Sequence, residues 1–297
     1  MSDDKSASLA DSVKARLKNK ADSLSVLYNL ILTRYGIERF LYKISVSEWK
    51  DTFILKGGML FVLWTDGIGY RPTMDSDFLW RGDASKDELI RVFKAICDAP
   101  TDLAGGLRFD SGTVAGAEIR KRTDYGGTRI TLTAFLGNSR IPLQFDIGVG
   151  DAVTPPAVLS EFPTLLGLPP PRLKTYPIPT VIAEKIETMV VNGMANSRMK
   201  DFYDLHVLTT RFPQNTSTVC EAMRNTFARR GTRLPTGEEE CFSIAFQTSP
   251  QKQIQWAAFL RKNRLTDAPA LFRDVAEPVG KYVLSLRLNS ESSPQNP

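Results

Sequence analysis

The spacing of apolar and polar residues predicts alternating helices and strands in the first half of the chain. Helices are predicted over residues 9–33, 39–44 and 85–98, and strands over 53–56 and 74–80. The third helix has the clearest start, because Ser85 is followed three residues later by Glu88 in a capping-box pattern. This mixture indicates a sheet that carries helices.

Longer stretches with strand-like alternation come next. They cover residues 107–119, 129–135 and 140–149, and Gly126-Gly127 and Gly137-Asn138 separate them as turn signals. Two proline clusters follow, Pro155-Pro156 and Pro169 to Pro171, and then a short predicted strand over 173–176. The clusters are typical of a boundary between two parts of a chain.

The rest of the chain has helical periodicity. Helices are predicted over residues 180–192, 197–211, 216–229, 250–263 and 269–287. We therefore predict an α+β fold with a mixed sheet core flanked by helices, followed by a C-terminal helical bundle. The expected domains are an α/β domain over 1–178 and a helical domain over 179–289, with a disordered tail over 290–297 rich in Ser, Pro, Gln and Asn.

Composition narrows the class of protein only slightly. Lys and Arg total 38 against 33 Asp and Glu, and the resulting charge of +5 permits a nucleic-acid partner without requiring one. Three scattered cysteines and one histidine, His206, lack the spacing of a zinc site. Apolar runs are too short to span a membrane, and the N-terminus lacks a signal pattern, so we expect no membrane partner and a cytoplasmic location.

A glycine pair, Gly57-Gly58, separates a predicted strand from a predicted short helix, and a loop over 66–71 follows that helix. Glycines at the start of a helix let phosphate oxygens approach backbone N–H groups. Such a pair is more often an ordinary turn. The next motif, which follows closely, favours the phosphate interpretation.

That motif is Asp75-Ser76-Asp77, whose two carboxylates share one face if the segment is a strand. Adjacent carboxylates repel each other unless a cation lies between them, and Mg²⁺ accepts carboxylate, phosphate and water oxygens. Asp146 is a further carboxylate among apolar neighbours in a predicted strand. If its strand pairs with that of Asp75 and Asp77, three carboxylates can hold two Mg²⁺ ions. The alternative is a set of hydrated strand-end aspartates.

Two helical segments add candidate cations. Lys185 lies beside an apolar stripe and can reach a phosphate, although a lysine whose charge extends to solvent is the ordinary interpretation. In the segment 197–205, Arg198 with Asp201, and Lys200 with Asp204, have the spacing of helix-stabilising pairs. Alternatively, Lys200 contacts a triphosphate and Asp201 orients Lys185 or the metal.

These motifs together resemble the AbiEii-type nucleotidyltransferase toxins of bacterial abortive-infection and toxin–antitoxin systems, whose catalytic core resembles the DNA polymerase β superfamily. The motifs that carry the resemblance are Lys56-Gly57-Gly58, Arg71 to Phe78, Asp146, Glu184 to Glu187 and Ser197 to Leu205. The resemblance implies a nucleotidyltransferase-like fold and transfer of a nucleoside monophosphate from an NTP. Some members modify the 3′ end of tRNA and so block translation, which makes tRNA the expected acceptor and a cognate antitoxin an expected partner.

The resemblance also assigns roles to residues. Asp75, Asp77 and Asp146 are the expected ligands of Mg²⁺, and Lys185 and Asp201 complete the expected catalytic set. The expected nucleotide-binding residues are Lys56, Gly57, Gly58, Arg71, Thr73, Lys185 and Lys200. Thr73 matches a position that is phosphorylated in some relatives. Gly58 departs from the pattern, because many nucleotidyltransferases carry Ser there.

Two other functions fit the same residues. A small-molecule nucleotidyltransferase, such as an antibiotic-modifying enzyme, would use the same core. A non-catalytic protein that binds a nucleotide or a partner is the third possibility, although all the expected carboxylates and Lys185 are present.

Overall fold

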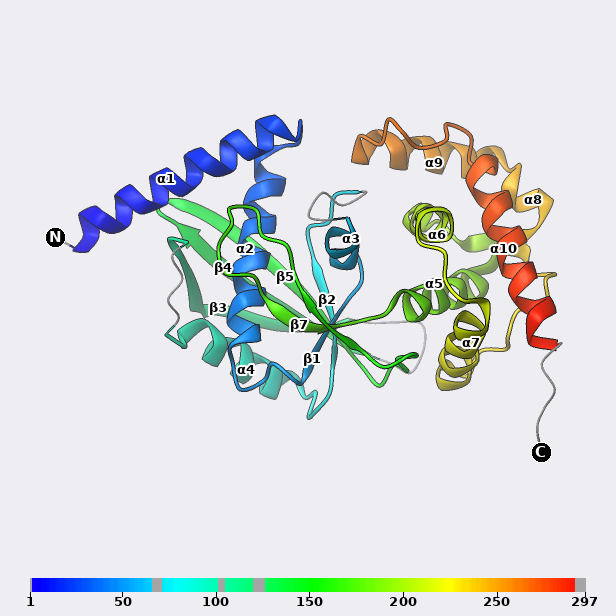
Figure 1. Cartoon of the computed structure of the whole chain (residues 1–297), viewed down its shortest axis with the longest axis horizontal. Helices are drawn as coiled ribbons and strands as arrows, with labels where there is room; N and C mark the ends of the chain where they lie inside the picture. Colours follow the sequence, from blue (N-terminus) through cyan, green and yellow to red (C-terminus); the bar gives the residue numbers. More distant parts are fainter. Residues whose placement is uncertain (1, 66–70, 101–104, 120–125, 292–297) are drawn as a thin grey trace. The chain divides into compact units, whose positions relative to one another are not determined.

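The computed structural model describes residues 2–65, 71–100, 105–119 and 126–291 (Figure 1). The chain forms two compact units. The first comprises Met1–Gly150 and Val158–Thr175, and the second comprises Asp151–Ala157 and Tyr176–Pro297. Within the described residues no helix is long and apolar enough to cross a membrane.

The first unit is built on one seven-stranded mixed sheet with the strand order β3-β4-β5-β2-β1-β7-β6. The strands are β1 (Phe53–Lys56), β2 (Ser76–Trp80), β3 (Leu107–Ile119), β4 (Gly127–Leu136), β5 (Ser139–Val149), β6 (Val158–Glu161) and β7 (Arg172–Thr175). Strand β2 is antiparallel to β1 and parallel to β5, so β5 and β2 are neighbours although a helix and two strands separate them in sequence. The predicted mixed sheet is confirmed, and β6 is a strand that the sequence did not predict.

The helices of this unit are α1 (Ser2–Ser23), α2 (Tyr28–Ser45), α3 (Met59–Trp64) and α4 (Lys86–Asp98). Helices α2 and α4 pack against one face of the sheet. The ring of Phe145 on β5 lies 4.7 Å from that of Phe40 on α2 and 5.3 Å from that of Phe93 on α4. Because side chains alternate along a strand, Gln144 and Asp146 face away from this aromatic core.

The N-terminal helices differ from the prediction. In place of one helix over 9–33 and a short one over 39–44, α1 ends at Ser23, Ser25 has a φ of 54°, and α2 runs unbroken to Ser45. The apolar spacing continued across the break, which hid it. Polar residues concealed the continuity of α2, because Glu38 and Arg39 are fully buried in it and form an ion pair of 3.2 Å.

Two other boundaries show how local hydrogen bonds decide an element. Strand β2 begins at Ser76, two residues later than predicted. The capping box before α4 forms only in part. Ser85 Oγ accepts from the Glu88 N–H at 3.3 Å, whereas the Glu88 carboxylate binds Arg91 and the Ser85 N–H donates to Asp83.

The second unit is helical, as predicted. Its helices are α5 (Ile178–Asn192), α6 (Met199–Arg211), α7 (Thr216–Arg230), α8 (Ile244–Gln247), α9 (Pro250–Asn263) and α10 (Arg273–Glu291), with short 3₁₀ turns at Gly193–Ala195 and Glu240–Phe242. An aromatic core joins them, since Phe202 on α6 lies 5.6 Å from Phe246 and 5.0 Å from Phe272. Together the two units confirm the predicted α+β class. Helix α10 extends past the predicted end to Glu291, and the remainder of the predicted tail, 292–297, lies outside the described residues.

Candidate functional site

The glycine pair lies between β1 and α3, and two motif side chains press directly on its backbone. A Cβ on Gly57, whose φ is +72°, would lie 2.0 Å from Asp77 Oδ2. A Cβ on Gly58 would lie 2.6 Å from Thr73 Oγ1 and 3.4 Å from an Arg71 guanidinium nitrogen. A larger residue at either position would therefore have to displace one of these side chains, and the structure brings the two sequence motifs into contact. The Thr73 hydroxyl also fills the space that a serine side chain at position 58 would enter.

This contact makes Gly57→Ala a sharp test of the site. The methyl group must displace the Asp77 carboxylate, so we expect the nucleotidyl transfer that the resemblance implies to fall by at least about tenfold, the cost of misplacing a reacting group. Gly167→Ala is the matched control, because Gly167 has a φ of +69° in the same unit and its Cβ would meet nothing within 4 Å. The measurements are the initial rates and unfolding temperatures of both variants. Equal activity in the two would contradict the close contact between Gly57 and Asp77.

The carboxylates lie on neighbouring strands. Asp77 on β2 is the register partner of Asp146 on the parallel strand β5, and adjacent strands lie about 4.8 Å apart. Asp75 immediately precedes β2 and accepts a hydrogen bond of 3.1 Å from Thr73 Oγ1. Lys56, at the end of β1, is the register partner of Asp77 on its other side. The strand pairing on which the three-carboxylate hypothesis depended is therefore present.

Arg129 on β4 is a residue of this cluster that the sequence analysis missed. Its guanidinium forms two hydrogen bonds of 2.8 Å to the two carboxylate oxygens of Asp146. The side-chain oxygen of Gln144, with its amide oriented to suit, accepts from the same guanidinium at 3.2 Å. The hydrogen bond to Asp146, and then the charges of Asp146, Asp75 and Asp77, raise the pKa of Arg129. All three carboxylates therefore act on one cation.

The sequence contained a signal for this pair. Residues counted equally outward from the Gly137-Asn138 turn face each other in a hairpin, and this places Arg129 opposite Asp146, as the structure has it. A buried or half-buried carboxylate needs such a partner, which the turn could have identified.

The three aspartates supply the kind of oxygen donors that a divalent cation binds. In the described part of the chain, no three His, Cys, Asp or Glu side chains already surround one point. Asp146 is instead held by Arg129, so a positive group already lies where the three negative charges converge. Carboxylate oxygens in this arrangement are the ligands that Mg²⁺ prefers.

A second charged cluster lies within the helical unit. Lys185 on α5 donates to Asp201 at 2.9 Å and to Asp204 at 2.7 Å, both on α6. The side chains of Asp201 and Asp204 are 3% and 0% exposed. Arg198 also binds Asp201, at 2.5 Å. Burial alone would raise the pKa of Asp201, but Lys185 and Arg198 outweigh it and hold that pKa well below its usual range.

This cluster distinguishes among the alternatives for these residues. The Lys185 side chain is 13% exposed and held in ion pairs with Asp201 and Asp204, so its charge does not extend to solvent. Arg198 and Asp201 form the helix pair expected from their spacing. Lys200 is exposed. Asp204 is held by Lys185, and not by Lys200 as the helix spacing suggested.

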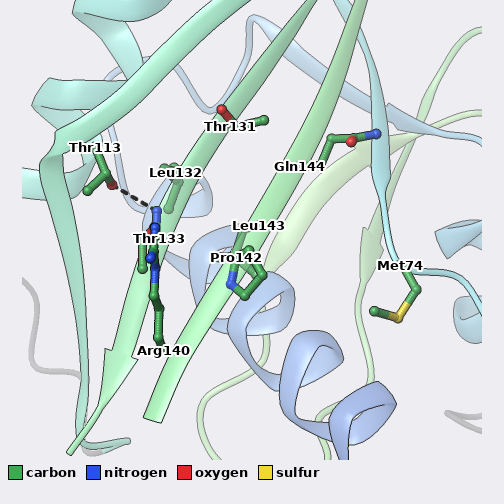
Figure 2. A pocket seen from close by; sticks show the side chains of 9 residues that line it. All are labelled: Met74, Thr113, Thr131, Leu132, Thr133, Arg140, Pro142, Leu143 and Gln144. Carbon is green, nitrogen blue, oxygen red and sulfur yellow. Dashed lines mark hydrogen bonds between the residues drawn. The ribbon is translucent and has the colours of Figure 1, made fainter. Parts of the chain in front are cut away.

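A groove lies over β3, β4 and β5 (Figure 2). Its volume is about 410 Å³, and its lining residues are Met74, Thr113, Thr131, Leu132, Thr133, Arg140, Pro142, Leu143 and Gln144. Thr113 Oγ1 accepts a hydrogen bond of 2.9 Å from the Thr133 backbone N–H, which ties β3 to β4 across the groove floor. Gln144 places one end of the groove next to Arg129 and Asp146.

Comparison with known families identifies this combination. Residues 39–278 match the family model described as the nucleotidyl transferase AbiEii toxin of a type IV toxin–antitoxin system. The chain belongs to the AbiEii nucleotidyltransferase toxin family. The resemblance that the motifs indicated is confirmed, and with it the general class of a nucleotidyltransferase. Members of this class generally use an NTP and a divalent metal ion, and the family implies an antitoxin partner.

Other comparisons give distant likenesses. No curated protein matches the chain. A Helicobacter pylori protein described as a candidate nucleotidyltransferase has a TM-score of 0.44 and 14% identity, covering 87% of this chain and 95% of its own. JHP933 from Helicobacter pylori has a TM-score of 0.45 and 14% identity, covering 86% and 92%.

Proposed function

We propose that this AbiEii-family protein transfers a nucleoside monophosphate from an NTP to a hydroxyl of RNA. The proposed acceptor is the 3′ end of tRNA, whose modification blocks translation. The observation that carries the proposal is the packing of Asp77 and Thr73 against Gly57-Gly58, with Asp146 in register beside Asp77. This arrangement supports a phosphate-binding role for the glycine backbone and a cation-binding role for the carboxylates of the same unit.

The proposed roles follow from position. The Gly57-Gly58 backbone, with Lys56 and Arg71 around it, binds the triphosphate. Asp75, Asp77 and Asp146 would hold Mg²⁺, and we propose a site for two ions. Bound there, Mg²⁺ would supply positive charge at the transferring phosphoryl group and activation of the acceptor hydroxyl. The family resemblance also proposes three site residues in the helical unit, which are Lys185, Lys200 and Asp201. The proposed domains are a catalytic domain over 1–178 and a helical domain over 179–289.

Basic side chains of the helical unit support an RNA acceptor. Exposed ones are Arg198, Arg224, Arg229, Arg261, Lys262 and Arg264. Arg230 does not belong with them, because it is held by Asp151, Glu184 and Glu187 at 2.7–3.1 Å. Exposed cationic side chains are suited to a polyanionic backbone.

The acceptor class can be tested directly. We expect tRNA to bind with an affinity that falls steeply with salt, because a polyanion releases many counterions, and labelled NTP to enter tRNA. An antibiotic acceptor would instead take the label with little dependence on salt. Label in an aminoglycoside but not in tRNA would select the small-molecule alternative, and label in neither would favour a protein that only binds its nucleotide or partner.

Thr73 offers a site at which this activity could be regulated. Its hydroxyl donates to Asp75 and lies against Gly58. Because Thr73 precedes β2, the preference of threonine for strands does not explain its presence at this position. A phosphate there would add a charge of about −1.5 to −2 beside the carboxylates and against the glycine backbone. We propose that phosphorylation of Thr73 switches the enzyme off.

Comparison of Thr73→Glu with Thr73→Val tests this. Thr73→Val removes only the hydroxyl and is expected to keep most of the activity, whereas Thr73→Glu is expected to lose about tenfold or more because a negative group enters the phosphate site. The measurements are NTP transfer and growth arrest on expression. Full activity of Thr73→Glu would remove the regulatory role and leave the catalytic assignment untouched.

A further inference from the structure

Arg129 is committed to the carboxylate cluster by several contacts. It donates to both oxygens of Asp146 at 2.8 Å, and the Gln144 oxygen lies 3.2 Å away. The β4–β5 hairpin fixes the pair, because Arg129 and Asp146 are register partners. The guanidinium is therefore placed by the backbone and does not depend on a flexible loop.

The two partners differ in their freedom to move. The Asp146 side chain is 18% exposed and the Arg129 side chain is 43% exposed. Arg129 can therefore leave toward solvent while Asp146 stays in the sheet beside Asp77. An arginine whose head is half in water holds its carboxylate less tightly than a buried one.

We propose that Arg129 is a positioning residue. In the metal-free protein it pairs with Asp146, the third carboxylate, and it is displaced from Asp146 when a divalent cation binds to the carboxylates. This inference rests on the proposed metal-dependent function. Without Arg129, Asp146 would lose its two hydrogen bonds to a cation. With it, a metal ion must replace an existing ion pair, so metal alone binds weakly.

A nucleotide changes that balance. An NTP brings negative charge to the same site, and the released guanidinium then has a new anionic partner. Metal and nucleotide should therefore bind cooperatively in the wild-type protein, because each favours the same displacement of Arg129. Removing the guanidinium should strengthen metal binding alone and reduce this cooperativity.

The test is titration of the full chain with Mn²⁺ followed by electron paramagnetic resonance, with and without a non-hydrolysable NTP. We expect Arg129→Gln to bind Mn²⁺ alone about fivefold more tightly than wild type, the equivalent of one partly exposed ion pair. Arg140→Gln is the control, since Arg140 is exposed on the same sheet and loses the same charge away from Asp146. It should stay within about twofold of wild type, because distant charges are screened.

The outcomes separate this inference from the function on which it rests. If wild type and Arg129→Gln bind Mn²⁺ equally, or Arg129→Gln binds it more weakly, Arg129 does not compete with metal and the inference is wrong. If neither protein binds Mn²⁺, or if Asp77→Asn binds it as well as wild type does, the proposed metal site itself is wrong. An unchanged unfolding temperature in Arg129→Gln verifies that the fold is retained.

Discussion

Replacing Asp77 with asparagine is expected to lower nucleotidyl transfer by about a thousandfold or more while the protein stays folded. Asp77 lies against the Gly57 backbone on one side and is the register partner of Asp146 on the other, so its charge serves both halves of the proposed site. Asparagine has nearly the same shape and fits the same space without the negative charge. The loss should therefore come from weakened cation binding and not from packing.

The rate of transfer and the unfolding temperature are the two measurements. Glu118→Gln is the matched control, because Glu118 is an exposed acid of the same sheet and its loss changes the net charge by the same amount. Near-normal transfer by Asp77→Asn, with unchanged metal dependence, would rule out Asp77 as a ligand.

Lys185→Gln is expected to be the second large effect, in stability as well as activity. Lys185 is the shared cation of Asp201 and Asp204, and its removal leaves the 0%-exposed carboxylate of Asp204 without it. Breaking a buried ion pair in this way typically costs about 3–5 kcal/mol of unfolding free energy. Arg198 still binds Asp201, so we expect the lower end of that range.

A double variant separates the structural effect of Lys185 from its proposed contact with the triphosphate. In Lys185→Gln with Asp204→Asn, the buried negative charge is removed together with the lysine, so stability should recover in large part. Activity should remain low if the lysine charge acts on the NTP. Recovery of both stability and transfer would show that Lys185 only holds α5 to α6.

The same cluster predicts a dependence of stability on pH. Because the pKa of Asp201 is lower in the folded state than its unfolded value of about 3.9, the ion pair stabilises the fold fully above that value. This stabilisation is lost as the pH falls below it. Acid unfolding of the wild type should therefore be steeper than that of Asp201→Asn.

The parts of the fold that could be predicted have strong local signals. Turn signals separate the long strands of the β3–β4–β5 meander, and the boundaries of β3 match the prediction over 107–119. The helix break near Ser25 and the continuity of α2 could not be predicted. A positive φ at a serine has no sequence pattern, and the buried ion pair of Glu38 and Arg39 resembles a solvent-exposed stretch.

The site shows the same division. The glycine pair and the aspartates are recognisable because phosphate and metal chemistry demands those residue types at close spacing. The contacts of Gly57 with Asp77 and of Gly58 with Thr73 depend on how β1 and β2 pair, which no local pattern specifies. The role of Arg129 depends on its register partner Asp146 on the neighbouring strand of the hairpin. The two residues are distant in sequence and form no local motif.

One measurement tests the central claim most directly. Wild-type protein is incubated with tRNA, Mg²⁺ and each NTP in turn, carrying ³²P at either the α- or the γ-phosphate, with Asp77→Asn in parallel. The account predicts that label from one or more α-labelled NTPs enters tRNA, that γ-label leaves as pyrophosphate, and that Asp77→Asn transfers neither. Entry of γ-label into tRNA, or no transfer of α-label from any NTP, would contradict it.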